Sequence, residues 1–116
     1  MTYEIVREIG SEDTGRMQRE STLVKIDPVI CRRSKTTDLY EVDHVIVEAL
    51  RIFDSGVTYE ETHVVASDAE GNSFEAILYQ ATRALTVPEA LFSIGEHNYD
   101  ASIETDAERE YENDND

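Results

Sequence analysis

Tryptophan is absent from this 116-residue sequence, and cysteine occurs only once. The single cysteine, Cys31, excludes a disulfide bond within the chain. No apolar run approaches the ~18 residues that are needed to cross a bilayer. The chain also opens without the basic and apolar segments of a signal peptide. These absences predict a cytoplasmic protein that does not bind a membrane.

Lysine is scarce as well, with two lysines against eight arginines, and the formal net charge is −16. Residues 38–116 contain 20 acids against three arginines, a balance of −17, whereas residues 21–37 contain four bases against Asp27. Nucleic acids are polyanions that bind through lysine and arginine. We therefore expect no direct nucleic-acid binding and a basic protein as partner. Adaptation to high salt is an alternative interpretation of the same acidity.

The length of the chain predicts one domain. Residues 104–116 contain seven acids and one base, with too few apolar side chains to form a core. We expect a single α+β domain over residues 1–103 and a disordered acidic tail over residues 104–116.

Strand signals dominate the first two thirds of the domain. Residues 39–53 have apolar side chains at helical spacing, but their β-branched residues favour a strand, and we choose the strand. Pro28 removes a backbone donor, so the strand before it either bends there or lies at a sheet edge. Strands are expected at 2–9, 21–26, 39–53, 59–66 and 98–104, with a loop at 10–20 and turns at 54–56 and 68–72.

Helix signals follow residue 71. Asn72 and Glu75 fit a capping box, and the apolar residues between Phe74 and Leu85 have helical spacing. A second, shorter helix is expected to begin at Thr86 and to end at Gly95. The fold class predicted is α+β, a small and mostly antiparallel sheet with one or two helices in the C-terminal half.

Few residues have the type and spacing of a metal-binding or catalytic site. His44, His63 and His97 lack the spacing of metal ligands. The run from Asp68 to Asn72 begins like a calcium loop, but the glycine and glutamate that such a loop requires are replaced by Ser73 and Tyr79. Cys31 precedes two arginines and could be a reactive thiolate, although a buried apolar role is favoured. We expect no metal, no cofactor, no catalytic residue and no enzymatic activity.

Three parts of residues 43–99 match a known kind of protein. They are His44-Val45-Ile46-Val47, Glu61-Thr62-His63-Val64-Val65 with Asp68-Ala69-Glu70-Gly71-Asn72, and Pro88-Glu89-Ala90-Leu91 with Ile94-Gly95. Through these segments, residues 43–99 resemble small phage accessory proteins. The resemblance implies a viral accessory protein with a small sheet and one or two helices, which acts in the host cytoplasm. It implies no catalytic residue.

The sequence as a whole predicts an acidic protein-binding accessory protein. It would block the basic, nucleic-acid-binding surface of a host protein, as a DNA mimic or an anti-defence inhibitor. The expected contact residues are Glu60, Glu61, Asp68, Glu70, Glu96 and Asp100, although these acids could equally serve only solubility. The alternatives are a structural component of virion assembly and a halophile-adapted domain of unknown activity. Formation of a homodimer is left open.

Overall fold

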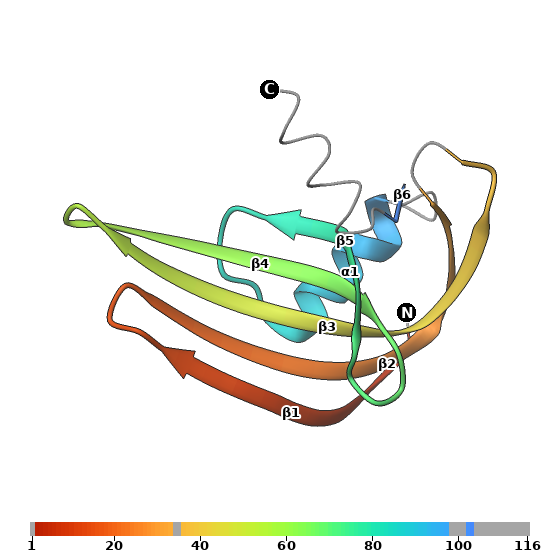
Figure 1. Cartoon of the computed structure of the whole chain (residues 1–116), viewed down its shortest axis with the longest axis horizontal. Helices are drawn as coiled ribbons and strands as arrows, with labels where there is room; N and C mark the ends of the chain where they lie inside the picture. Colours follow the sequence, from red (N-terminus) through yellow and green to blue (C-terminus); the bar gives the residue numbers. More distant parts are fainter. Residues whose placement is uncertain (1, 34–35, 98–101, 104–116) are drawn as a thin grey trace.

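Five long strands form one antiparallel sheet in the order β1-β2-β3-β4-β5 in the described part of the chain (Figure 1). The structure is a computed structural model that describes residues 2–33, 36–97 and 102–103. The elements are β1 (Tyr3–Asp13), β2 (Met17–Arg33), β3 (Leu39–Asp54), β4 (Val57–Ser67), β5 (Ser73–Ala81), α1 (Val87–His97) and β6 (Ser102–Ile103). The predicted small, mostly antiparallel sheet is confirmed. The predicted tail lies outside the described residues.

The helix α1 covers one face of this sheet, which we call the inner face. Side chains alternate along a strand, so every second residue of β2, β3 and β4 points toward α1. The buried core consists of Val24, Ile26, Cys31, Val42, Val45, Val47, Val64, Ala66, Ala90, Leu91 and Ile94. Within the described residues, no helix is long and apolar enough to cross a membrane.

The sheet bends around α1 at an irregularity in β2. The pairing of β2 with β3 shifts between Lys25 and Val29, where Pro28 supplies no donor. Beyond this shift Cys31 and Val42 return to the core beside the helix. The bend predicted at Pro28 is thus confirmed, whereas β2 is a central strand that pairs with both β1 and β3.

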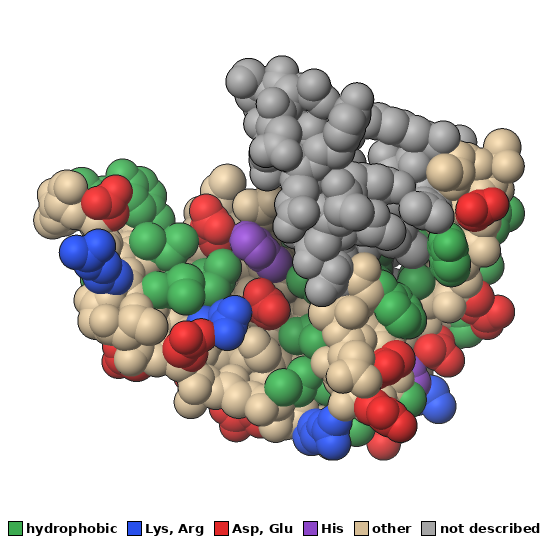
Figure 2. Space-filling model, in the orientation of Figure 1, with side chains coloured by type: hydrophobic (Ala, Val, Ile, Leu, Met, Phe, Trp, Pro, Cys, Tyr) green, Lys and Arg blue, Asp and Glu red, His purple; other side chains and the backbone are tan. Residues whose placement is uncertain are grey.

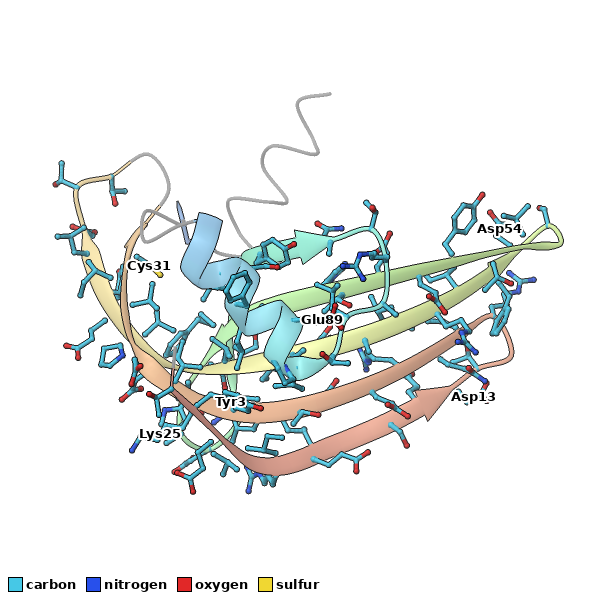
Figure 3. The ribbon with its side chains drawn as sticks, turned by 180° about the vertical axis from the view of Figure 1, so that it is seen from behind. Tyr3, Asp13, Lys25, Cys31, Asp54 and Glu89 are labelled. Atoms are coloured by element: carbon cyan, nitrogen blue, oxygen red, sulfur yellow. The ribbon has the colours of Figure 1, made fainter. Side chains whose placement is uncertain are left out.

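The turn between β4 and β5 crosses the opposite face, which we call the outer face. Figures 1 and 3, seen from opposite sides, place α1 and this turn on different faces of the sheet. Arg7 of β1 donates a hydrogen bond to the carbonyl oxygen of Glu70 in the turn. On the same face Leu23, Ile46 and Val65 form one buried cross-strand row. The middle of the sheet is therefore buried on both faces.

The chain forms strands over more of its length than the sequence predicts. The strand over 39–53 is confirmed, and so is the start of a helix after Thr86. The helix predicted over 72–85 is wrong, because most of that segment is β5, which pairs with β4. Gly95 does not end α1, which continues to His97. The expected loop over 10–20 is mostly strand, with β1 and β2 joined by residues 14–16.

Candidate protein-binding surface

Two hairpin turns extend the sheet beyond α1, on the left in Figure 1, and we call this part the distal end. Ser55 and Gly56, which form the β3–β4 turn, both have positive φ angles, of 52° and 79°. A two-residue turn of this kind matches the right-handed twist of its strands. The Phe53 N–H donates to the carbonyl oxygen of Arg16 across a distance of 2.8 Å, which joins this hairpin to the β1–β2 hairpin. The distal end is thus one connected unit.

The outer face of the distal end presents apolar side chains. The register places Met17 beside Ile52, and Ile52 beside Tyr59. The same face of neighbouring rows adds Leu50 and Val57. We call these five residues the outer patch. Tyr59 and Val57 are each 50% exposed, and Figure 2 shows the apolar surface gathered over the left parts of β3 and β4.

An acidic rim surrounds the outer patch. Glu12 pairs with Arg19 at an N–O distance of 2.6 Å, and the Glu61 carboxylate lies 2.9 Å from the His63 ring nitrogen. The alternation of side chains adds Glu48 and Asp54 to this face, so the rim has four carboxylates. The guanidinium groups nearby are those of Arg19 and of Arg16, which is exposed in the adjoining β1–β2 turn. An apolar centre with a polar rim is the usual composition of a protein interface.

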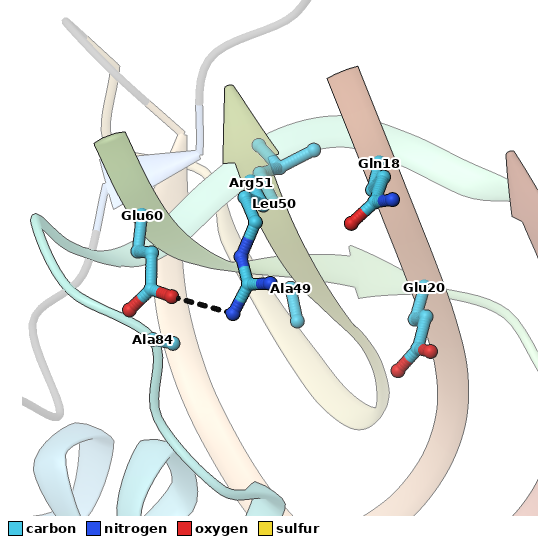
Figure 4. Close-up of a pocket in the computed structure, with 7 residues that line it drawn as sticks. All are labelled: Gln18, Glu20, Ala49, Leu50, Arg51, Glu60 and Ala84. Carbon is cyan, nitrogen blue, oxygen red and sulfur yellow. Dashed lines mark hydrogen bonds and ion pairs between the residues drawn. The ribbon is translucent and has the colours of Figure 1, made fainter. Parts of the chain in front are cut away.

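The inner face of the distal end contains a shallow hollow of about 220 Å³, shown in Figure 4. The Arg51 guanidinium lies 2.9 Å from the Glu60 carboxylate on the neighbouring strand. Glu20 has no ion-pair partner among the described residues. We call this site the inner hollow, and its lining residues are Gln18, Glu20, Ala49, Leu50, Arg51, Glu60 and Ala84. The side chain of Leu50 itself lies on the outer face.

The contact residues predicted from the sequence do not form one surface. Glu60 and Glu61 are consecutive in β4, so they point to the inner and outer faces respectively. Asp68 and Glu70 lie together in the β4–β5 turn. The side chain of Glu96 and the whole of Asp100 lie outside the described residues.

Sequence reasoning missed the outer patch. Leu50, Ile52 and Tyr59 lie in expected strands, Met17 lies in the expected loop, and Val57 lies between the expected turn at 54–56 and the expected strand at 59–66. No common face was predicted from the sequence for these five residues. The signal that could have found the patch is the Asp54-Ser55-Gly56 turn. A two-residue turn at Ser55 and Gly56 fixes the pairing of Ile52 with Tyr59, and this pairing places Leu50 and Val57 on the same face.

Other candidate sites gain no support as reactive centres. The described residues contain no group of three histidine, cysteine or acidic side chains placed to hold a metal ion. The His44 ring lies 2.9 Å from the carboxylate of Asp43, to which it is adjacent in sequence. Cys31 is fully buried in the core, and this burial raises the pKa of its thiol. The structure therefore favours the apolar role for Cys31.

We expect the Cys31 thiol to react with a thiol reagent at least ~100-fold more slowly in the folded protein than in urea-unfolded chain, because reaction requires local opening. The measurement is the rate of colour development with an aromatic disulfide reagent, with and without denaturant. Equal rates in the two states would contradict a buried thiol.

Asp68 organises the β4–β5 turn and should titrate abnormally. The Asn72 side-chain amide, followed by the backbone N–H groups of Asn72, Glu70 and Gly71, lowers the pKa of the Asp68 carboxyl from 3.8. A lowered folded-state pKa stabilises the fold above pH ~4, and this stability is lost as the pH falls through the folded pKa. An NMR titration of the carboxyl carbon should show a pKa below 3.8, and Asn72→Ala should raise it. A pKa at or above 3.8 in the unmodified protein contradicts this account of the turn.

Comparisons with protein-family models, with curated proteins and with solved structures found no match to this chain. The resemblance to phage accessory proteins therefore stays an expectation from the sequence. The geometry of the distal end carries the functional argument.

Proposed function

We propose that this chain is an acidic protein-binding accessory protein that docks its outer patch on a basic, nucleic-acid-binding protein, which it thereby blocks. A viral accessory protein acting on a host protein is the setting that the resemblance to phage accessory proteins implies. The single observation that carries the proposal is the outer patch itself, in which exposed Tyr59 and Val57 lie inside an acidic rim.

The two parts of this surface have different tasks. The net charge of −16 and the acidic rim attract a basic partner from a distance and raise the association rate. The apolar side chains act at contact, where desolvated aromatic residues contribute most of the binding energy. Tyr59 is therefore the expected anchor. A partner whose basic groove normally holds nucleic acid would lose access to that groove while bound.

The described arginines support a partner that is basic and not a nucleic acid. Three of them are already paired within the chain, so their charge is offset before any ligand approaches. The pairs are Arg19 with Glu12, Arg51 with Glu60, and Arg83 with Glu89 at N–O distances of 2.6, 2.9 and 3.7 Å. A phosphate backbone would meet an excess of carboxylates at the distal end.

Displacement of DNA from a captured protein tests the proposal. Proteins retained by the immobilised chain at low salt and released at high salt are purified, and their binding to labelled duplex DNA is measured by gel shift. We expect the chain to release the DNA in proportion to its concentration, and we expect no shift of DNA by the chain alone. A ternary complex of DNA, captured protein and chain would overturn the blocking function. Direct DNA binding by the chain near micromolar at physiological salt would overturn the charge argument.

A structural component of an assembly is the second candidate function. The outer edge of β1 has no partner strand among the described residues, and Ile5 and Val6 are 55% and 45% exposed. Such an edge can pair with a strand of a second copy. Two irregularities in the pairing with β2 interrupt β1, however, and irregular edges resist this pairing. Sedimentation equilibrium distinguishes the two functions, because the assembly component forms oligomers and the inhibitor does not require them.

A further inference from the structure

The inner hollow has the size of a site for one side chain. Pockets for drug-sized ligands have volumes of about 300–1,000 Å³, and the hollow has about 220 Å³. Ala49 forms its floor, and its methyl group is the smallest side chain between the longer ones of Glu20 and Arg51 (Figure 4). Ala84, from the segment that leads into α1, adds to the wall. A small group that enters from solvent can therefore approach the sheet above Ala49.

The charges of the inner hollow favour a cation. Arg51 is bound to Glu60, as the dashed line in Figure 4 shows, so these two charges offset each other. Glu20 then leaves one uncompensated negative charge on the opposite side of the hollow. An anionic group would meet this carboxylate, whereas a cationic group would find an acceptor that no described cation occupies.

The hydrogen-bonding groups favour a planar cation with several donors. The Gln18 amide nitrogen donates to Asp13 at 3.2 Å, which leaves the Gln18 carbonyl oxygen as an acceptor beside Glu20. Glu20 on β2 and Glu60 on β4 are two strand spacings apart across β3 and two residues apart along the strands. At about 4.8 Å per spacing and about 3.3 Å per residue, they lie about 12 Å apart. A guanidinium group presents five N–H donors in one plane and can use acceptors on more than one side. A lysine ammonium offers only a point charge.

We propose that the inner hollow binds the guanidinium group of one arginine side chain of the basic partner, with Glu20 as the main acceptor and Gln18 as the second. The partner then contacts both faces of the distal end, the outer patch on one and the inner hollow on the other. The identity of the partner rests on the proposed function. Binding of an arginine side chain by the hollow can be measured without the partner.

The probe is N-acetyl-L-arginine N-methylamide, titrated into the ¹⁵N-labelled protein and followed by NMR. We expect saturable binding in the millimolar range, with shifts concentrated at residues 18–20, 49–51 and 84. Glu20→Gln should weaken binding by about fivefold, which is the scale of an exposed ion pair. The matched control Glu8→Gln removes an exposed β1 carboxylate outside the hollow and should change the affinity less than about twofold. Arg51→Gln should strengthen binding by a few-fold, because it frees Glu60 and removes a like charge.

Three results would overturn the inference. Equal losses from Glu20→Gln and Glu8→Gln would mean diffuse attraction to an acidic protein. Weaker binding after Arg51→Gln would mean that the resident guanidinium does not compete with the probe. Equally tight binding of N-acetyl-L-lysine N-methylamide would mean that the hollow selects charge and not a guanidinium. The chain could fail to displace DNA while the probe still binds only at the inner hollow. That result would overturn the proposed function, but the hollow would remain an arginine site.

Discussion

Replacing Leu91 with alanine is expected to lower the free energy of unfolding by about 3–5 kcal/mol. Leu91 is 1% exposed and belongs to the same buried core as Val45 and Val64 of the sheet. Because α1 is the only helix among the described residues, no other helix there can fill the cavity that the substitution leaves. The loss is a large part of the ~5–15 kcal/mol that stabilises a typical domain.

The next residue of the same helix provides the matched control. Phe92 is 66% exposed, so Phe92→Ala should change the free energy of unfolding by no more than about 0.5 kcal/mol. Urea unfolding followed by circular dichroism measures both variants. Equal losses from the two substitutions would contradict the placement of α1 on the inner face.

Replacing Thr62 with valine is expected to cost about 2–4 kcal/mol, although the two side chains have nearly the same shape. The fully buried hydroxyl donates to the carbonyl oxygen of Arg83 at 3.0 Å and accepts the N–H of Leu85 at 2.8 Å. Valine leaves two partly buried backbone groups, the Arg83 carbonyl and the Leu85 N–H, without this partner. A backbone group that is left unpaired in a buried position costs about 1–3 kcal/mol. The segment that contains these two groups connects β5 to α1 and supplies a wall of the inner hollow.

Two further variants distinguish the loss of the hydroxyl from a general effect of packing on the free energy of unfolding. Thr58→Val, at an exposed position of the same strand, should be neutral to about 0.5 kcal/mol, and Thr62→Ser, which keeps the hydroxyl, should cost less than Thr62→Val. Hydrogen exchange at the Leu85 N–H should accelerate in Thr62→Val and stay protected in Thr62→Ser. Unchanged exchange in the valine variant would show that the hydroxyl does not hold this segment.

The strands of this fold were largely predictable from sequence because their signals are local. The β-branched residues over 39–53 outweighed a helical spacing of apolar residues, and the structure has β3 there. The start of α1 was also predicted, and Thr86 and Glu89 form a capping box there, with the backbone N–H of each residue donating to the side chain of the other.

The error over 72–85 has a tertiary cause. Asn72 looked like a helix cap, but its backbone N–H and side-chain amide both donate to Asp68 and close the β4–β5 turn. The chain after this turn lies along the free edge of β4, where pairing satisfies backbone groups of both strands. A local helical spacing of apolar residues carries no information about that edge.

The candidate surface was less predictable than the fold. The sequence pointed to acidic residues and to an electrostatic mimic of DNA, but alternation along β4 sends Glu60 and Glu61 to opposite faces. How far the sheet extends beyond α1 depends on long-range packing, so the exposure of Ile52 and Tyr59 could not be read from periodicity. The sequence predicted a contact surface made of acidic residues. With the structure, the proposed contact is instead the outer patch, which is apolar and lies inside an acidic rim.

The affinity of the captured protein for two tyrosine variants tests the outer patch most directly. Tyr59 in the outer patch and Tyr40 near the other end of β3 are both strand residues, 50% and 44% exposed. We predict that Tyr59→Ser weakens binding by about 30-fold or more, the scale of an interface hot spot, and that Tyr40→Ser changes the affinity less than about twofold. Titration calorimetry with the captured protein gives both values, and unchanged affinity in Tyr59→Ser, or equal losses in the two variants, would contradict the outer patch as the binding surface.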